Sequence, residues 1–158
     1  MPTYLTGPTQ LFGAAATVVD TVPKHAQGTR AQDLDGGQYV YGQTKDTILQ
    51  FDYCFFDGEF NADQSAADVI GIGGVAMADG VEDGYGWFQI YGAGHVTVAA
   101  AVASDVPLYL TATAGQLDDA AVAGDFVFGI YSSAAAGAQG VVACFLNYPM
   151  TSDGAYLT

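Results

Sequence analysis

The positive charges of this chain are confined to its first third, and this constrains the fold. Lys24, Arg30 and Lys45 are the only lysines and arginines among 158 residues, whereas 17 residues are Asp or Glu. Solvent-facing helices are commonly built from Lys, Arg and Glu, which are strong helix formers. The chain has little of this material and instead has 21 Gly, 10 Tyr and 9 Phe. The composition therefore predicts an all-β fold.

Short β-branched and aromatic runs, bounded by Gly, Asp, Asn or Pro, mark the expected strands. Their close spacing predicts an antiparallel β-sandwich or barrel of about eight strands. The runs are Gln38–Tyr41, Ile48–Phe56, Val69–Met77, Tyr85–Tyr91, His95–Val102, Leu108–Thr111, Phe126–Tyr131 and Val141–Asn147. Between the fourth and fifth runs, Gly92-Ala93-Gly94 can supply the positive φ of a short loop, so these two runs are expected to form a hairpin.

Residues 1–36 differ from the rest of the chain. Their apolar residues lack a sustained period and are interrupted by Pro8, Gly13, Pro23 and Gly28, which is typical of an extended arm. The expected organisation is an N-terminal arm over residues 1–36 and a β-sandwich or barrel body over residues 37–158. A flexible terminus without a role is the alternative, but the arm holds more apolar side chains than disordered tails usually do.

The net charge of −14 lies entirely in residues 46–158, because the three cations of residues 1–45 balance Asp20, Asp33 and Asp35. A large single-sign field repels phosphate and anionic lipid, so neither nucleic acid nor membrane is an expected partner. No secretory signal is recognisable after Met1. Synthesis in a reducing cytoplasm is compatible with this, and Cys54 and Cys144, both within apolar runs, are predicted to be buried free thiols.

Motifs for catalysis are lacking, and the chain is predicted not to be an enzyme and to need no cofactor. It contains no nucleophile elbow, zinc-protease, phosphate-loop or paired-cysteine pattern. Asp57, Glu59, Asn61 and Asp63 alternate as calcium ligands do, with Asp68 five residues further on. Ala62 stands where a calcium loop needs Gly, however, and Asp68 replaces its final Glu. A solvated acidic loop is the preferred interpretation, with no metal expected.

Three phrases of the sequence, in this order, resemble the small decoration or cement proteins that coat the heads of tailed bacteriophages. They are residues 28–42 (GTRAQDLDGGQYVYG), residues 73–78 with 86–92 (GGVAMA and GWFQIYG) and residues 107–124 (PLYLTATAGQLDDAAVAG). Each phrase is a strand-and-turn pattern, and together they cover about residues 28–130. The first 27 residues and the Cys144 strand match no part of that family's pattern.

The resemblance implies a noncatalytic structural protein of the virion. Such a protein binds the major capsid protein on the outside of the assembled head, commonly as a homotrimer, and reinforces the shell. The neutral arm is expected to lie along the capsid or neighbouring subunits while the acidic body faces solvent. Large aromatics and Arg are usual interface anchors. The expected contact residues are therefore Tyr4, Leu5, Leu11, Phe12, Arg30, Tyr39 and Tyr41.

Three other interpretations remain open. A phage fibre or adhesin head would bind host-surface glycans through exposed Tyr and Asp, with Trp87 and Tyr85 as stacking platforms. A β-sandwich enzyme would use two carboxylates, although the acids of this chain cluster in apparent turns. The excess of Asp over Lys also fits salt adaptation, which is compatible with decoration.

Overall fold

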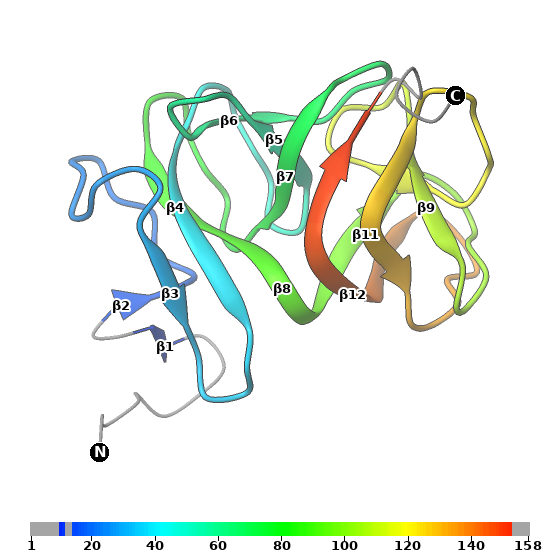
Figure 1. The fold of residues 1–158 in the computed structure, drawn as a ribbon, viewed down its shortest axis with the longest axis horizontal. Coiled ribbons are helices and arrows are strands. Elements are labelled where there is room, and N and C mark those ends of the chain that lie inside the picture. The colour runs from blue at the N-terminus through cyan, green and yellow to red at the C-terminus, as the bar shows by residue number, and fades with distance from the viewer. Residues whose placement is uncertain (1–9, 12–13, 153–158) are drawn as a thin grey trace.

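The computed structural model describes residues 10–11 and 14–152, and throughout this part it is all-β (Figure 1). The described residues contain no helix, and so none that is long and apolar enough to cross a membrane. The strands are β1 (Gln10–Leu11), β2 (Ala14–Ala15), β3 (Arg30–Gln32), β4 (Gln38–Thr44), β5 (Tyr53–Phe56), β6 (Asn61–Gln64), β7 (Gly71–Ala76), β8 (Tyr85–Val98), β9 (Pro107–Leu110), β10 (Leu117–Asp118), β11 (Phe126–Ser132) and β12 (Gly140–Thr151). The predicted fold class is confirmed.

Strand pairing closes two rings that share the long strand β8. The first half of β8 pairs with β4 and β7, and the ring continues from β4 through β6 and β5 back to β7. The second half of β8 pairs with β12, and that ring continues through β11, β9 and β10 back to β8. Most pairs are antiparallel, but β4–β6 and β10–β8 are parallel. Closure of this kind leaves few open strand edges.

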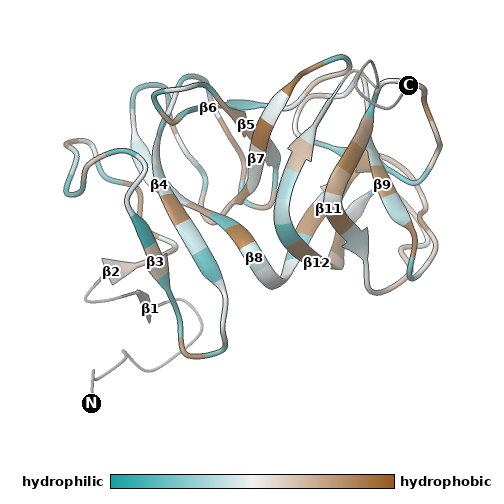
Figure 2. Cartoon of the chain, viewed as in Figure 1, coloured by the Kyte–Doolittle hydropathy of each residue, from teal (hydrophilic) through white to brown (hydrophobic). Residues whose placement is uncertain are grey.

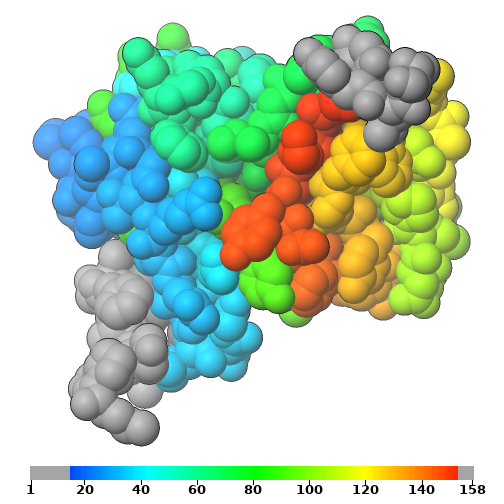
Figure 3. All heavy atoms as spheres, viewed as in Figure 1, coloured from blue at the N-terminus to red at the C-terminus, as the bar shows by residue number. Residues whose placement is uncertain are grey.

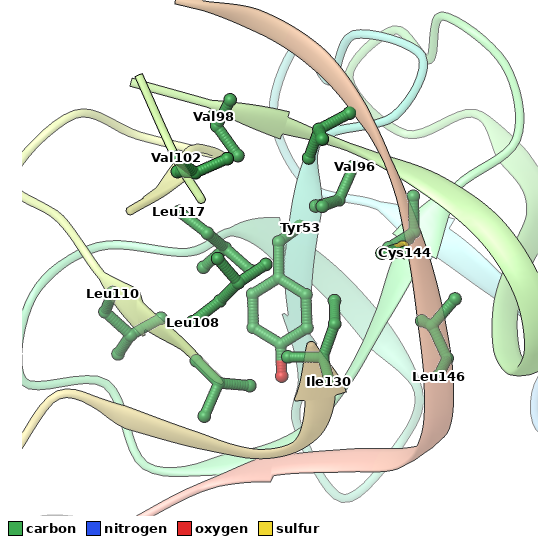
Figure 4. Packing of buried hydrophobic residues seen from close by; sticks show 13 residues of the cluster. Tyr53, Val96, Val98, Val102, Leu108, Leu110, Leu117, Ile130, Cys144 and Leu146 are labelled. Carbon is green, nitrogen blue, oxygen red and sulfur yellow. The ribbon is translucent and has the colours of Figure 1, made fainter. Parts of the chain in front are cut away.

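Each ring encloses its own hydrophobic core, and β5 and β7 form the wall between the two. Successive side chains of a strand point to opposite faces. Tyr53 and Val75 therefore enter the core of the β8–β12 ring, whereas Cys54 and Ala76 enter the core of the β4–β8 ring. Figure 4 shows the Tyr53 ring surrounded by Leu108, Leu117, Ile130 and other side chains of the core of the β8–β12 ring. In Figure 2, brown segments of β4 and β8 lie next to pale and teal ones.

Both cysteines are free and buried, as predicted. Cys54 belongs to the core of the β4–β8 ring and Cys144 to the core of the β8–β12 ring. Burial raises the pKa of the Cys144 thiol to about 12 and raises that of Cys54 well above its usual value. The thiols thus behave as small hydrophobic side chains.

The predicted hairpin at Gly92–Gly94 is wrong, because β8 runs without a break from Tyr85 to Val98. Gly92 has a φ of +99°, and a Cβ atom there would lie 3.1 Å from the Cα atom of Gly37. The buried Gln89 donates through Nε2 to the carbonyl oxygens of Tyr91 (3.1 Å) and Ala93 (2.9 Å). The glycines therefore bend the strand and do not reverse it. The bend allows the first half of β8 to belong to one ring and the second half to the other.

Several boundaries also differ from the predicted runs. The run Ile48–Phe56 is a strand only from Tyr53, because Phe51 has a φ of +71°. The predicted acidic loop contains β6, which pairs with β5 and β4. Such short strands owe their existence to neighbours distant in sequence, and their own residues carry little β pattern.

The N-terminal segment covers the outer face of β4 and β8 from Ala16 onward. Ala16, Tyr39, Tyr41, Met77 and Trp87 form a third buried cluster between this segment and the sheet. The amide of Asp20 donates to the carbonyl oxygen of Tyr85 at 2.8 Å, and β3 pairs with β4. Residues 16–32 are therefore packed on the body, which determines where an arm deletion has to end.

Candidate interaction surface

Two of the three cations are neutralised within the chain. The Lys24 Nζ atom lies 2.7 Å from Asp20 Oδ1, and the Lys45 Nζ atom lies 3.5 Å from Asp83 Oδ1. Arg30 is exposed on β3 and makes no ion pair with any described residue. Its guanidinium is therefore available to pair with an acidic group of another molecule.

A charge-free region lies beside Arg30. Residues 126–152, which contain β11 and β12, include no Asp, Glu, Lys, Arg or His, and residues 84–104, which contain β8, include only His95. These strands are neighbours in the sheet. The acidic residues that give the chain its charge of −14 therefore leave one continuous group of strands uncharged.

The outer face of this region carries exposed and half-buried apolar side chains that touch one another. Tyr131 and Phe145 stack with ring centroids 5.8 Å apart, Phe145 and Tyr91 are 5.7 Å apart, and Tyr91 and Tyr148 are 5.3 Å apart. Met150 continues the row and pairs across the strands with Ile72 of β7. We call these six residues the aromatic strip; its members are Ile72, Tyr91, Tyr131, Phe145, Tyr148 and Met150.

An irregularity in β11–β12 pairing creates the strip. The register shifts between Phe128 and Ile130, where Gly129 has a φ of +76° and Tyr148 a φ of +51°. A Cβ atom on Gly129 would lie only 2.3 Å from the carbonyl oxygen of Asn147. The bulge changes the alternation along β12, so that Phe145 before it and Tyr148 after it both face outward.

A small apolar pocket of about 60 Å³ lies between the strip and Arg30. Its walls include Val40, Phe56 and Ile90 from the core of the β4–β8 ring. Tyr148 and Arg30 stand at its edge, and the Tyr148 hydroxyl donates to Gln38 Oε1 at 2.7 Å. In Figure 3, β12, coloured orange to red, lies at the surface between the blue and cyan N-terminal third and β11. The pocket is large enough for the end of one apolar side chain.

The predicted contact residues differ in how the structure places them. Tyr4, Leu5 and Phe12 lie outside the described residues, and Leu11 lies in β1. Arg30 is exposed, as an interface role requires. Tyr39 and Tyr41 are 3% and 0% exposed, so their rings cannot reach another molecule while the N-terminal segment stays in place.

The two tyrosine hydroxyls bind buried carboxylates instead. Tyr41 donates to Asp20 Oδ2 and Tyr39 donates to Asp33 Oδ2, both at 2.7 Å. Burial and the hydrogen bond to Asp20 raise the pKa of Tyr41 to about 12, and burial together with Asp33 raises that of Tyr39 further. Burial alone would raise the pKa of Asp20, but hydrogen bonds from Lys24 and Tyr41 lower it below its usual value. These pairs hold the N-terminal segment and the β3–β4 hairpin.

The alternating acidic residues are used to build a turn. Asp57 Oδ1 accepts from the amides of Glu59 (2.8 Å) and Asn61 (2.9 Å), and Asp57 Oδ2 accepts from Asn61 Nδ2 at 2.7 Å. These hydrogen bonds, with those from Asn61 the largest contribution, lower the pKa of Asp57. Within the described residues no three His, Cys, Asp or Glu side chains converge as metal ligands would.

The proposed glycan platform is not at the surface. Trp87 is 4% exposed and packs against His25 and Tyr41, with ring centroids 5.3 Å and 5.1 Å away. Tyr85 is partly buried in the same cluster. An indole in this position stabilises the contact between the N-terminal segment and β8, and it is not available to stack on a sugar.

Sequence reasoning missed the aromatic strip. Its members come from four strands, and the hydrophobic pattern of each strand alone does not say which face is outward. One signal was present in the sequence: the 27 residues from Phe126 to Ser152 carry no charge in a chain whose net charge is −14.

Comparison with solved structures shows a related fold. The chain is similar to the N base of the head fiber gp8.5 of bacteriophage phi29, with a TM-score of 0.54 and 15% sequence identity. The superposition covers 72% of this chain and 97% of that one. No protein-family model and no curated protein matches the sequence. The likeness is one of fold, since the two sequences have little in common.

Proposed function

We propose that this chain is a noncatalytic structural protein of a phage head, bound to the outside of the assembled capsid as a decoration or cement protein. The observation that carries the proposal is the fold shared with the base of a phage head fiber over 97% of that base. The resemblance of residues 28–130 to phage decoration proteins also supports a role in a phage head. The proposed location is the capsid exterior of a virion, after synthesis in the host cytoplasm.

The proposed orientation follows from charge. Residues 1–19 contain no charged side chain, whereas residues 46–158 carry the net charge of −14. An uncharged, apolar segment can contact the major capsid protein or a neighbouring copy without a large electrostatic cost, while the acidic surface faces solvent and keeps particles apart. Ordering such a segment costs at least about 1 kcal/mol per residue, and burial of its apolar side chains has to offset this cost. Tyr4, Leu5, Leu11 and Phe12 are the residues proposed to supply that burial.

The experiment that tests the proposal is quantitative protein analysis of purified particles. The copy number of this chain is compared with that of the major capsid protein. A number near one per capsid subunit is expected for a decoration protein. Absence of the chain from purified particles would refute a virion role.

A deletion tests the role of the N-terminal segment. Removal of residues 1–13 spares Ala16, Asp20 and β3, so the body should stay folded. The truncated protein is expected to unfold at nearly the wild-type temperature but to bind capsids that lack the chain far less tightly. Unchanged capsid occupancy by a folded truncated protein would show that these residues are not the contact.

A second candidate is the base of a fibre that projects from the head and carries a host-binding part. The fold likeness to a head fiber base favours it directly. This candidate predicts a few tens of copies or fewer per particle. Binding of host-surface glycans by the isolated chain would favour an adhesin head, although the burial of Trp87 removes the strongest stacking candidate.

A further inference from the structure

The aromatic strip combines three properties. Its exposed members include Tyr131, Tyr148, Met150 and Ile72, with 43–47% of each side chain accessible. The strands β8, β11 and β12 that carry most of it contain no Asp, Glu, Lys or Arg. Arg30, the exposed cation without an ion pair among the described residues, lies at its end beside the pocket. The nature of the partner follows from these properties taken together.

A basic partner would not bind at the aromatic strip. Complementary potentials guide association, so a positively charged surface would bind the acidic turns and not a region without carboxylates. An uncharged apolar surface with one free cation at its edge fits a partner that is itself strongly acidic. Such a partner can approach only where repulsion is least, and its carboxylates can pair with Arg30.

We propose that the aromatic strip is the surface through which copies of this chain bind one another. A second copy has the required chemistry, because it is acidic and brings an identical uncharged face. The face of one copy supplies the rings, and the pocket beside Arg30 receives an apolar side chain of the other. This inference goes beyond the proposed function, because it assigns a surface to contact between copies, and it can be tested without any capsid.

Salt dependence gives the first test. Two copies with a net charge of −14 repel each other, and salt shortens the screening length from about 10 Å at 0.1 M to about 3 Å at 1 M. Sedimentation equilibrium of the full-length protein is therefore expected to show self-association that tightens as NaCl is raised. A wild-type protein that stays monomeric at every concentration and salt level would overturn the proposal.

Matched variants give the second test. Tyr131→Asp and Met150→Asp add a charge within the strip and are each expected to weaken self-association by about tenfold or more. Leu49→Asp and Val81→Asp are the controls, because these side chains are 56% and 58% exposed but lie on loops outside the strip. The controls should change the net charge equally and leave association near the wild-type value. Equal weakening by strip and control variants would contradict the assignment.

Arg30→Gln tests the charged contact. This variant should weaken association at low salt and have a smaller effect at high salt, where an ion pair is screened.

Near-ultraviolet circular dichroism and thermal unfolding of every variant establish that it is folded. Tyr131→Ser, which removes the ring without adding charge, provides the same test if the Asp variants unfold. Wild-type association of folded Tyr131→Ser would refute the role of that ring.

Failure of this inference is distinguishable from failure of the proposed function. A monomeric wild type whose Tyr131→Asp variant is lost from particles would place the strip against the capsid, which overturns contact between copies and leaves decoration intact. Strip-dependent association of a chain that purified particles lack would support the inference and refute the virion role.

Discussion

The Tyr41 hydroxyl lies 2.7 Å from Asp20 Oδ2 and joins the first strand of the body to a residue 21 positions earlier. Lys24 approaches the other carboxylate oxygen of Asp20 at 2.7 Å, and its amide donates to the Tyr41 hydroxyl at 3.3 Å. Tyr41 is fully buried, and Asp20 is 9% exposed. This small network closes the N-terminal segment over the outer face of β4 and β8.

Removing the hydroxyl should loosen that segment. Tyr41→Phe leaves the buried Asp20 without one of its donors, and hydrogen bonds to charged groups contribute about 1.5–3 kcal/mol. We expect a loss of unfolding free energy of that order and faster tryptic cleavage after Lys24. Tyr109→Phe is the control, because no hydrogen bond to another side chain or backbone atom is made by that hydroxyl in the described residues. Equal cleavage rates in the two variants would contradict this role.

The same pair makes stability sensitive to alkali. The folded-state pKa of Tyr41, about 12, exceeds the unfolded value of 10. The stabilisation is therefore fully present below pH 10 and is lost as pH rises through 12. We expect the unfolding free energy, measured with denaturant between pH 8 and 12, to fall less with rising pH in Tyr41→Phe than in the wild type. The decline will not vanish, because the raised pKa values of Tyr39 and Cys144 act in the same direction.

Tyr53→Phe should have the opposite effect on stability. The Tyr53 hydroxyl is fully buried and has no hydrogen-bond partner among the described residues, and burial raises its pKa. An unpaired buried polar group costs about 1–3 kcal/mol. Its removal is expected to leave the unfolding free energy unchanged or to raise it. A loss above about 1 kcal/mol, measured by urea unfolding, would mean that the hydroxyl is hydrogen-bonded in solution.

Gly129→Ala tests the bulge that shapes the aromatic strip. The added Cβ atom would meet the Asn147 carbonyl oxygen at 2.3 Å, and the φ of +76° disfavours any side chain. Destabilisation of more than about 2 kcal/mol is expected. Gly137→Ala is the matched control, since no atom lies within 4 Å of a Cβ atom there. An unchanged unfolding free energy in Gly129→Ala would show that the backbone at the bulge can rearrange to accept a side chain.

The thiols provide a probe of the two cores. Cys54 and Cys144 are 0% and 1% exposed, and burial raises both pKa values. Neither should react with a thiol reagent at pH 8 until the protein unfolds. In denaturant, two thiols per chain should react at once. Rapid labelling of one thiol in the native protein would show that the ring of strands around that cysteine opens locally.

The all-β class and the approximate places of several strands follow from residue patterns alone. The scarcity of Lys, Arg and Glu removed the material for exposed helices, and runs such as Phe126–Tyr131 and Val141–Asn147 hold β-branched and aromatic residues that suit strands. Free, buried cysteines were predictable for the same reason, because each lies inside an apolar run. These properties depend on residues close together in the chain, and local pattern is sufficient to reveal them.

How the strands close and which faces are exposed depends on contacts between residues that are distant in the chain. Gly92-Ala93-Gly94 suits a hairpin and a bend equally, and the bend results from Gln89 and from different partners for the two halves of β8. Tyr41 looked like an interface anchor, yet Asp20 and the N-terminal segment bury it. Tyr91, Phe145 and Tyr148 became neighbours through the β8–β12 pairing and the bulge at Gly129. Long-range pairing and packing set these features, and no local stretch of sequence contains that information.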